Sequence, residues 1–240
     1  MFNFIKKRET KSEKLLKESI LLSQELEWAN VFHDSVKGKP WLASLSINVG
    51  RWAGNYSFFY LLHRILQDYK PSSILEFGLG ESSKFISTYL TNALPNTKHV
   101  VIEHDTIWEA KFNENFNLAT NSTIINCSLQ QTQVNGFTTN SYENIQNKIN
   151  SLFDFYIVDG PFGSYRFSRY DMYYLAEKFT PQDEFIILFD DTHRKGEEDS
   201  VNAIATMIAS KGIEIFVQSY EGVKKNTIIA TKKYKFATSL

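Results

Sequence analysis

Three aspartates stand where two apolar runs end in the second half of the chain. Asp159 follows FDFYIV (Phe153–Val158), and the pair Asp190-Asp191 follows EFIILF (Glu184–Phe189). Runs of this length and composition predict buried strands of a parallel sheet. The carboxyl ends of such strands meet at the ligand-binding edge of the sheet, so the three carboxylates should converge there. Unpaired, they would repel one another, and a cation is expected to offset their charge.

Two kinds of cation suit this acidic cluster. A divalent ion such as Mg²⁺ takes oxygen ligands, and all three aspartates would be its ligands. The alternative is an arginine, as an ion-pair partner or as a clamp on an anionic substrate. The arginines near the two runs are Arg166, Arg169 and Arg194. Both alternatives stay open at this point, with a slight preference for the arginines.

A glycine-rich turn lies earlier, in ILEFGLGESSK (Ile74–Lys84). An apolar run carries Glu76 near its end, and a turn with Gly78 and Gly80 then leads into a helix that begins near Ser82. Glycine lets the backbone come close to a ligand, and the free N–H groups of a helix start can hold a carboxylate or a phosphate. The turn therefore predicts a ligand-binding site.

Ser83 separates this turn from two common nucleotide-binding motifs. It stands where the nicotinamide fingerprint G-x-G-x-x-G has its third glycine, and where a phosphate-binding P-loop has the glycine before its lysine. Glu103 closes the next apolar run, HVVIE (His99–Glu103). A carboxylate about 20 residues beyond the glycines can accept both ribose hydroxyls of an adenosine.

The elements that would position these residues follow a regular order from Pro71 onward. Short β-rich runs alternate with helical segments, which is typical of a parallel sheet covered by helices. Only residues 219–226 separate the last two runs, which suits an antiparallel hairpin. We therefore predict an α/β fold: a seven-stranded, mostly parallel doubly wound sheet with a reversed C-terminal hairpin. The predicted strands are Ser73–Phe77, His99–Glu103, Thr123–Asn126, Phe153–Val158, Glu184–Phe189, Glu214–Gln218 and Thr227–Thr231. The predicted helices between them are Ser82–Ala93, Ile107–Phe116, Tyr142–Ser151, Ser168–Lys178 and Glu197–Lys211.

The chain divides into a predicted N-terminal helical extension, residues 1–70, and one sheet-containing domain, residues 71–240. Helices are expected over residues 11–29, with amphipathic spacing, and over Tyr56–Tyr69. The first should pack on the domain or on a twin subunit, which would make the protein a homo-oligomer. Its lysines suggest a membrane-surface helix as the alternative, but its acidic residues argue against that.

Charge, cysteine content and apolar stretches restrict the partners and the location that we expect for this protein. The chain has 26 Lys and Arg against 27 Asp and Glu, a net charge of -1, so no nucleic-acid partner is expected. Cys127 is the one cysteine, which excludes an internal disulfide framework and fits a reducing compartment. The start is too charged for a signal peptide, and no apolar stretch reaches the roughly 18 residues that stable membrane insertion needs. A cytoplasmic protein is expected.

The glycine turn, the acidic end of the second run and the seven-strand order resemble the class I S-adenosylmethionine-dependent methyltransferases, a superfamily with a Rossmann-like fold. The resemblance covers residues 71–233. It implies S-adenosylmethionine as cofactor, with Glu103 on its ribose and Ser128 bordering its adenine. The residues implied for the methionine end and the adjoining helix start are Glu76, Gly78, Gly80 and Ser82.

The acidic cluster resembles the catechol O-methyltransferase branch, where an aspartate after strand four joins an Asp-Asn pair after strand five. Here the pair is Asp190-Asp191, so a carboxylate replaces the amide ligand, which puts Mg²⁺ binding in doubt.

The function that the resemblance implies is methyl transfer to a hydroxyl of a small-molecule or glycan acceptor. Asp159 is expected to accept the hydroxyl proton, with His193 as a second candidate base and Arg166 as a substrate clamp. Two alternatives stay open. One is a methyltransferase-like binding module without turnover. The other is an NAD-dependent oxidoreductase, which Ser83 and the terminal hairpin disfavour.

Overall fold

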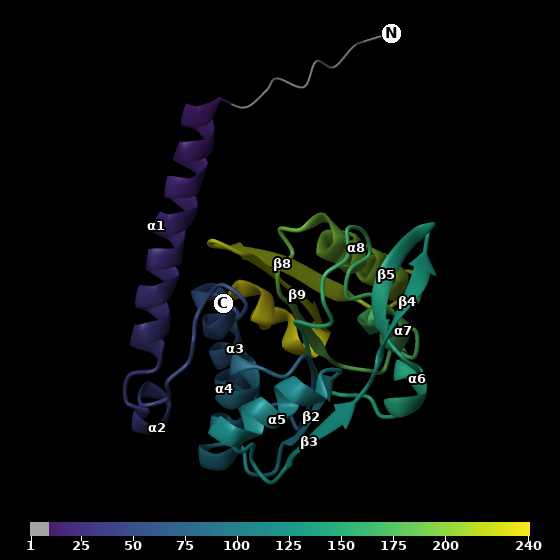
Figure 1. The fold of residues 1–240 in the computed structure, drawn as a ribbon, viewed down its shortest axis with the longest axis horizontal. Coiled ribbons are helices and arrows are strands. Elements are labelled where there is room, and N and C mark those ends of the chain that lie inside the picture. The colour runs from purple at the N-terminus through teal and green to yellow at the C-terminus, as the bar shows by residue number, and fades with distance from the viewer. Residues whose placement is uncertain (1–9) are drawn as a thin grey trace.

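The computed structural model describes residues 10–240, and its centre is a seven-stranded sheet (Figure 1). The strand order is β3-β2-β1-β6-β7-β9-β8. Neighbouring strands run parallel except for the two pairs that β9 makes, with β7 and with β8. The predicted α/β class and mostly parallel sheet are confirmed, and β9 is the strand that reverses. The strands are β1 (Ser73–Phe77), β2 (Lys98–Glu103), β3 (Ser122–Asn126), β6 (Phe155–Val158), β7 (Ile186–Phe189), β8 (Ile215–Glu221) and β9 (Lys225–Thr231).

Helices cover both faces of the sheet. They are α1 (Lys11–Ser35), α2 (Pro40–Ala43), α3 (Tyr56–Tyr69), α4 (Glu81–Asn92), α5 (Thr106–Asn115), α6 (Ile145–Lys148), α7 (Asp171–Ala176), α8 (Lys195–Ser210) and a C-terminal 3₁₀ helix, η1 (Lys232–Ser239). Successive side chains of a strand point to opposite faces. Ile74 and Ile157 accordingly pack with α3 and α4, whereas Leu75 and Val158 pack with α7 and α8. The sheet is therefore buried on both sides, as a doubly wound fold requires.

A separate antiparallel hairpin, β4 (Leu129–Val134) with β5 (Phe137–Tyr142), lies outside the main sheet (Figure 1). It is absent from the sequence-based prediction, although Asn135-Gly136 at its turn is a frequent hairpin signal. Both turn residues have positive φ, 50° and 81°. The helix predicted over Tyr142–Ser151 is wrong at its start, because Tyr142 pairs with Leu129 as the last residue of β5. Only the short α6 remains of it.

The C-terminal half of α1 anchors the N-terminal extension to the domain. Glu25 accepts hydrogen bonds from Asn55 Nδ2 (2.7 Å) and from the backbone N–H groups of Tyr56 (2.8 Å) and Val223 (3.0 Å). Phe32 is buried in the core beside α3. The N-terminal half of α1 projects beyond the rest of the molecule (Figure 1). The exposed apolar side chains of this half are Leu15, Leu16, Ile20 and Leu22, and Leu26 follows them in the second half. Within residues 10–240, no helix is both long enough and apolar enough to cross a bilayer.

Candidate active site

A pocket of about 470 Å³ opens at the edge of the sheet where the parallel strands end. Four residues at or just past the ends of the adjacent strands β2, β1, β6 and β7 line it: Glu103, Gly78, Asp159 and Asp191. The predicted glycine turn and the predicted acidic cluster therefore share one cavity. The other lining residues come mostly from loops and include Trp52, Trp108, Tyr142, Gly160, Phe162 and Lys224.

Gly78 is the position in the turn that only glycine can fill. Its φ is 95°, in the left-handed region that side chains disfavour. A β-carbon there would also lie 3.3 Å from the carbonyl oxygen of Asp159, at the far side of the crevice. Gly80 is different: its backbone is extended, with a φ of −171°, and a β-carbon would meet open space. The close backbone approach thus belongs to Gly78.

Glu103 is held firmly at the end of β2. Its Oε2 accepts a hydrogen bond from the Leu79 N–H at 2.9 Å, which ties the carboxylate to the glycine turn. Its Oε1 accepts from the N–H groups of His104 (2.6 Å) and Asp105 (2.8 Å). Each carboxylate oxygen can accept more than one hydrogen bond. The carboxylate is therefore fixed in place and still able to accept from a ligand in the pocket.

Four of the predicted cofactor residues do not line this pocket: Glu76, Gly80, Ser82 and Ser128. Glu76 is fully buried beneath the turn, where its Oε2 accepts from Ser83 Oγ (2.8 Å) and contacts His99 Nε2 (3.1 Å). Ser83 Oγ in turn accepts from the Gly80 N–H, so Glu76 supports the start of α4 from below. Ser82 is buried in the first turn of α4, and Ser128 is exposed between β3 and β4.

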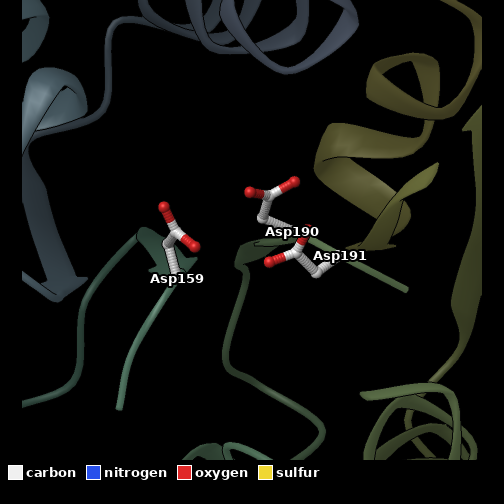
Figure 2. A group of neighbouring side chains, drawn as sticks. All are labelled: Asp159, Asp190 and Asp191. Carbon is white, nitrogen blue, oxygen red and sulfur yellow. The ribbon is translucent and has the colours of Figure 1, made fainter. Parts of the chain in front are cut away.

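The three aspartates converge as the strand order predicts. Figure 2 shows Asp159 on one side of the crevice, facing Asp190 and Asp191 on the other. One carboxylate oxygen from each lies within 4.8 Å of the others.

Two buried cations offset this acidic cluster. The Nη2 of Arg169 lies 3.1 Å from Asp159 Oδ1 and 3.0 Å from Asp191 Oδ2. The Nζ of Lys224 lies 3.3 Å from Asp190 Oδ2 and 3.2 Å from Asp191 Oδ1. Arg169 and Asp191 both have left-handed backbone, with φ of 57° and 61°. Strained residues of this kind cluster at functional sites, where the surrounding structure holds them in place.

The pKa values of the three carboxyl groups do not all shift in the same direction. Burial, together with the negative charge of Asp190, raises the pKa of Asp159 well above its ordinary value. Burial and Asp191 likewise raise the pKa of Asp190. Burial acts in the same direction on Asp191, but Arg169 and Lys224 outweigh it and lower the pKa of that group. Asp191 is thus the ionised partner of the two cations, and Asp159 is a stronger base than Asp191.

The acidic cluster has the oxygen donors that a divalent cation would need. However, the ammonium of Lys224 and the guanidinium of Arg169 already lie within ion-pair distance of all three carboxylates. The geometry thus favours an offset of the charge by basic side chains, as in the arginine alternative, over an offset by a metal ion.

The other predicted polar residues lie at varying distances from the cluster. Arg194 lines the pocket, and its half-exposed Nη1 is 3.1 Å from Asp191 Oδ2. Arg166 instead pairs with Asp199 and stacks over Phe137 of β5, outside the pocket lining. His193 belongs to the exposed residues and does not line the pocket; the partial loss of solvent around its ring lowers its pKa.

Two residues of the site carried no signal that singled them out. Lys224 lies in the β8–β9 turn, where a lysine is ordinarily solvent-exposed. Tyr142 ends the hairpin that the sequence-based prediction lacks. The Asn135-Gly136 turn could have located that hairpin, but nothing in the sequence indicates which residue of it reaches the pocket.

Comparison with known proteins rests on structure. No protein-family model matches the sequence, and no curated protein matches it. An O-methyltransferase from Bacillus cereus, solved in complex with S-adenosylhomocysteine, is similar over 88% of this chain and 91% of its own, with 14% identity and a TM-score of 0.51. An S-adenosylhomocysteine-bound methyltransferase from Podospora anserina is similar over 93% and 97%, with 14% identity and a TM-score of 0.46. The Bacillus cereus match shows that this chain has the class I methyltransferase fold, as the sequence resemblance implied.

Proposed function

We propose that this protein is an S-adenosylmethionine-dependent methyltransferase that acts on a hydroxyl of a small-molecule or glycan acceptor. The observation that carries the proposal is that Gly78, Glu103 and Asp159 line one and the same pocket. The first two residues suit the methionine and ribose parts of the cofactor, and the third suits an acceptor hydroxyl. The Bacillus cereus protein with the same fold is named an O-methyltransferase, which agrees with this choice.

S-adenosylmethionine, when bound, would supply a methyl group carried on a sulfonium. The acceptor oxygen would form a bond to that methyl carbon as the carbon–sulfur bond breaks, and the sulfur would leave as a neutral thioether. The residues of the chain then have two tasks. One is to hold the acceptor oxygen in line with the methyl group, because alignment lowers the barrier without any further chemistry. The other is to take the hydroxyl proton, for which Asp159 is placed at the crevice. Arg169 holds this carboxylate by its Oδ1 and leaves Oδ2 for the acceptor.

Aromatic side chains at the pocket support a ring-shaped acceptor. Trp52 is 94% exposed and Phe162 61% exposed, although both line the pocket. Exposed aromatic rings at a pocket provide flat apolar faces on which a sugar or another ring can stack. A small-molecule or glycan acceptor is therefore the class that we propose.

Calorimetric titration with S-adenosylhomocysteine tests the cofactor. Wild-type protein should bind it, and Glu103→Ala should weaken binding by about 1–3 kcal/mol, because a charged acceptor is lost. Glu114→Ala, at an exposed position of α5, is the control and should bind as wild type does. Because Glu103 also holds the glycine turn, Glu103→Gln provides a milder second variant, and circular dichroism should establish that each variant is folded. Binding of NAD in place of S-adenosylhomocysteine would refute the proposal.

Asp159→Asn tests the proton acceptor. Methyl-labelled S-adenosylmethionine, offered with a panel of free sugars, nucleotide-linked sugars and phenols, should label an acceptor with the wild-type protein. The variant should still bind S-adenosylhomocysteine but transfer at least about 100-fold more slowly, since general-base catalysis contributes on this order. Cofactor binding by the wild type without any transfer would favour a binding module instead.

A further inference from the structure

Tyr142 places a hydroxyl without a protein partner at the wall of the pocket. Its side chain lines the pocket and is 1% exposed, and the hydroxyl makes no hydrogen bond to any of residues 10–240. An unsatisfied buried polar group carries a desolvation cost, and native proteins retain few of them. Phenylalanine would fill the same space without that cost, so the presence of a hydroxyl here calls for a partner other than residues 10–240.

Hydrogen bonds at the end of β5 fix the position of Tyr142. The N–H of Tyr142 donates to Asp171 Oδ1 at 2.9 Å, and the neighbouring Ser141 hydroxyl donates to the same oxygen at 2.6 Å. Asp171 is buried at the start of α7 and so locks the end of β5. The Tyr142 ring packs near Phe77, with centroids 6.1 Å apart. The side chain is therefore not free to turn away in search of another partner.

The hydroxyl lies where the loops that follow β1 and β6 meet. A β-carbon built on Gly160 would come 2.7 Å from the Tyr142 hydroxyl and 3.1 Å from the backbone nitrogen of Gly78. Only a residue without a side chain leaves that space open. Both glycines and Tyr142 line the same pocket. The hydroxyl thus faces the crevice between the ends of β1 and β6.

The negative charge of Glu103 indicates which part of a ligand the Tyr142 hydroxyl would contact. Burial raises the pKa of Tyr142 well above its ordinary value, and the negative charge of Glu103 is the second largest cause. The hydroxyl therefore stays neutral and able to donate. Glu103 is the residue proposed to hold the ribose, so the neighbouring donor faces the nucleoside part of the cofactor.

We propose that the Tyr142 hydroxyl donates a hydrogen bond to the nucleoside part of the bound cofactor. This rests on the function proposed above. It assigns a binding role to the β4–β5 hairpin, which delivers this one side chain to the pocket. The hydroxyl contributes to affinity for the cofactor and does nothing for the stability of the protein without ligand.

The test is Tyr142→Phe, which removes one oxygen atom and keeps the ring. Affinity for S-adenosylhomocysteine should fall about 3- to 10-fold, the usual effect of one net hydrogen bond. Affinity for 5′-methylthioadenosine, which lacks the amino-acid part, should fall by the same factor. The melting temperature without ligand should stay the same or rise, because the variant no longer buries an unsatisfied hydroxyl.

Tyr156→Phe is the matched control. The Tyr156 hydroxyl is also buried, but it accepts from the Phe153 N–H at 2.9 Å and does not line the pocket. This variant should lose stability and keep its affinity. Unchanged affinity of Tyr142→Phe would overturn the inference, as would a loss confined to S-adenosylhomocysteine or a melting temperature lowered as in Tyr156→Phe. Failure of the wild type itself to bind S-adenosylhomocysteine would refute the proposed function instead.

Discussion

At the scale of single residues, the pocket depends on how the charges of three carboxylates, two of them buried, are offset. The sequence places the carboxylates together because each follows a parallel strand, but it does not identify the cations. Arg169 was one of three candidate arginines, and Lys224 was not a candidate. Lys224 is 8% exposed and contacts two of the carboxylates, as Arg169 does.

Replacing Lys224 tests whether basic side chains, rather than a metal ion, offset the charge of the three carboxylates. Lys224→Met, which keeps the length of the side chain, should lower the free energy of unfolding at pH 7 by about 3–5 kcal/mol, because it leaves buried carboxylates unpaired. Lys225→Met, one position along, is the matched control. Adding Asp190→Asn to Lys224→Met should recover part of the loss. Urea unfolding of the wild type, Lys224→Met, Asp190→Asn and the double variant measures the coupling.

Two results would contradict this account. Equal losses in Lys224→Met and Lys225→Met would mean that the buried ion pairs contribute nothing specific. A wild-type melting temperature that rises with Mn²⁺ and falls again with chelator would instead assign the offset to a metal, since ligands that bind the folded state stabilise it.

At the scale of elements, His63 joins three helices of the N-terminal extension and the domain. It lies in α3, its Nε2 is 3.1 Å from the Ser35 carbonyl oxygen of α1, and its Nδ1 contacts the Tyr89 hydroxyl of α4. A neutral imidazole satisfies both contacts, with one nitrogen donating and the other accepting. Burial, and secondly the charge of Lys39, lower its pKa to about 4.

This histidine predicts a loss of stability in acid. The folded-state pKa lies below the ordinary value of 6.5, so the unfolded chain binds the proton first as the pH falls. The contribution is therefore complete above pH 6.5 and decreases toward pH 4, by about 1.4 kcal/mol per pH unit. Asp171, whose pKa is raised to about 6 by burial, acts in the opposite direction over much of this range, so a variant is needed to isolate the histidine.

His63→Gln provides that comparison. The difference in unfolding free energy between wild type and His63→Gln should shift against the wild type by roughly 3 kcal/mol between pH 7 and pH 4. His33→Gln, at an exposed position of α1, is the control and should show no such shift. Parallel stability curves for wild type and His63→Gln, measured by urea unfolding at several pH values, would show that His63 is not buried in its neutral form.

At the scale of the whole molecule, the site is assembled from segments that are far apart in the chain. The main sheet brings together the ends of β1, β2, β6 and β7, the β8–β9 turn adds Lys224, and the β4–β5 hairpin adds Tyr142. The N-terminal extension also takes part, because Trp52 precedes α3 and lines the same pocket. No single segment holds enough of the site to bind a ligand alone.

The sequence by itself determined the seven strands, the fold class and the convergence of Gly78, Glu103 and the three aspartates. These follow from local patterns, since apolar runs indicate strands, and parallel strands that alternate with helices all end at one edge. Only the tertiary structure decided which side chains meet those residues across the crevice. Lys224, Arg169 and Tyr142 reach the site from a turn, a left-handed loop position and a hairpin end. Their contacts depend on packing between segments that are far apart in the chain, and such packing produces no periodic pattern in the sequence.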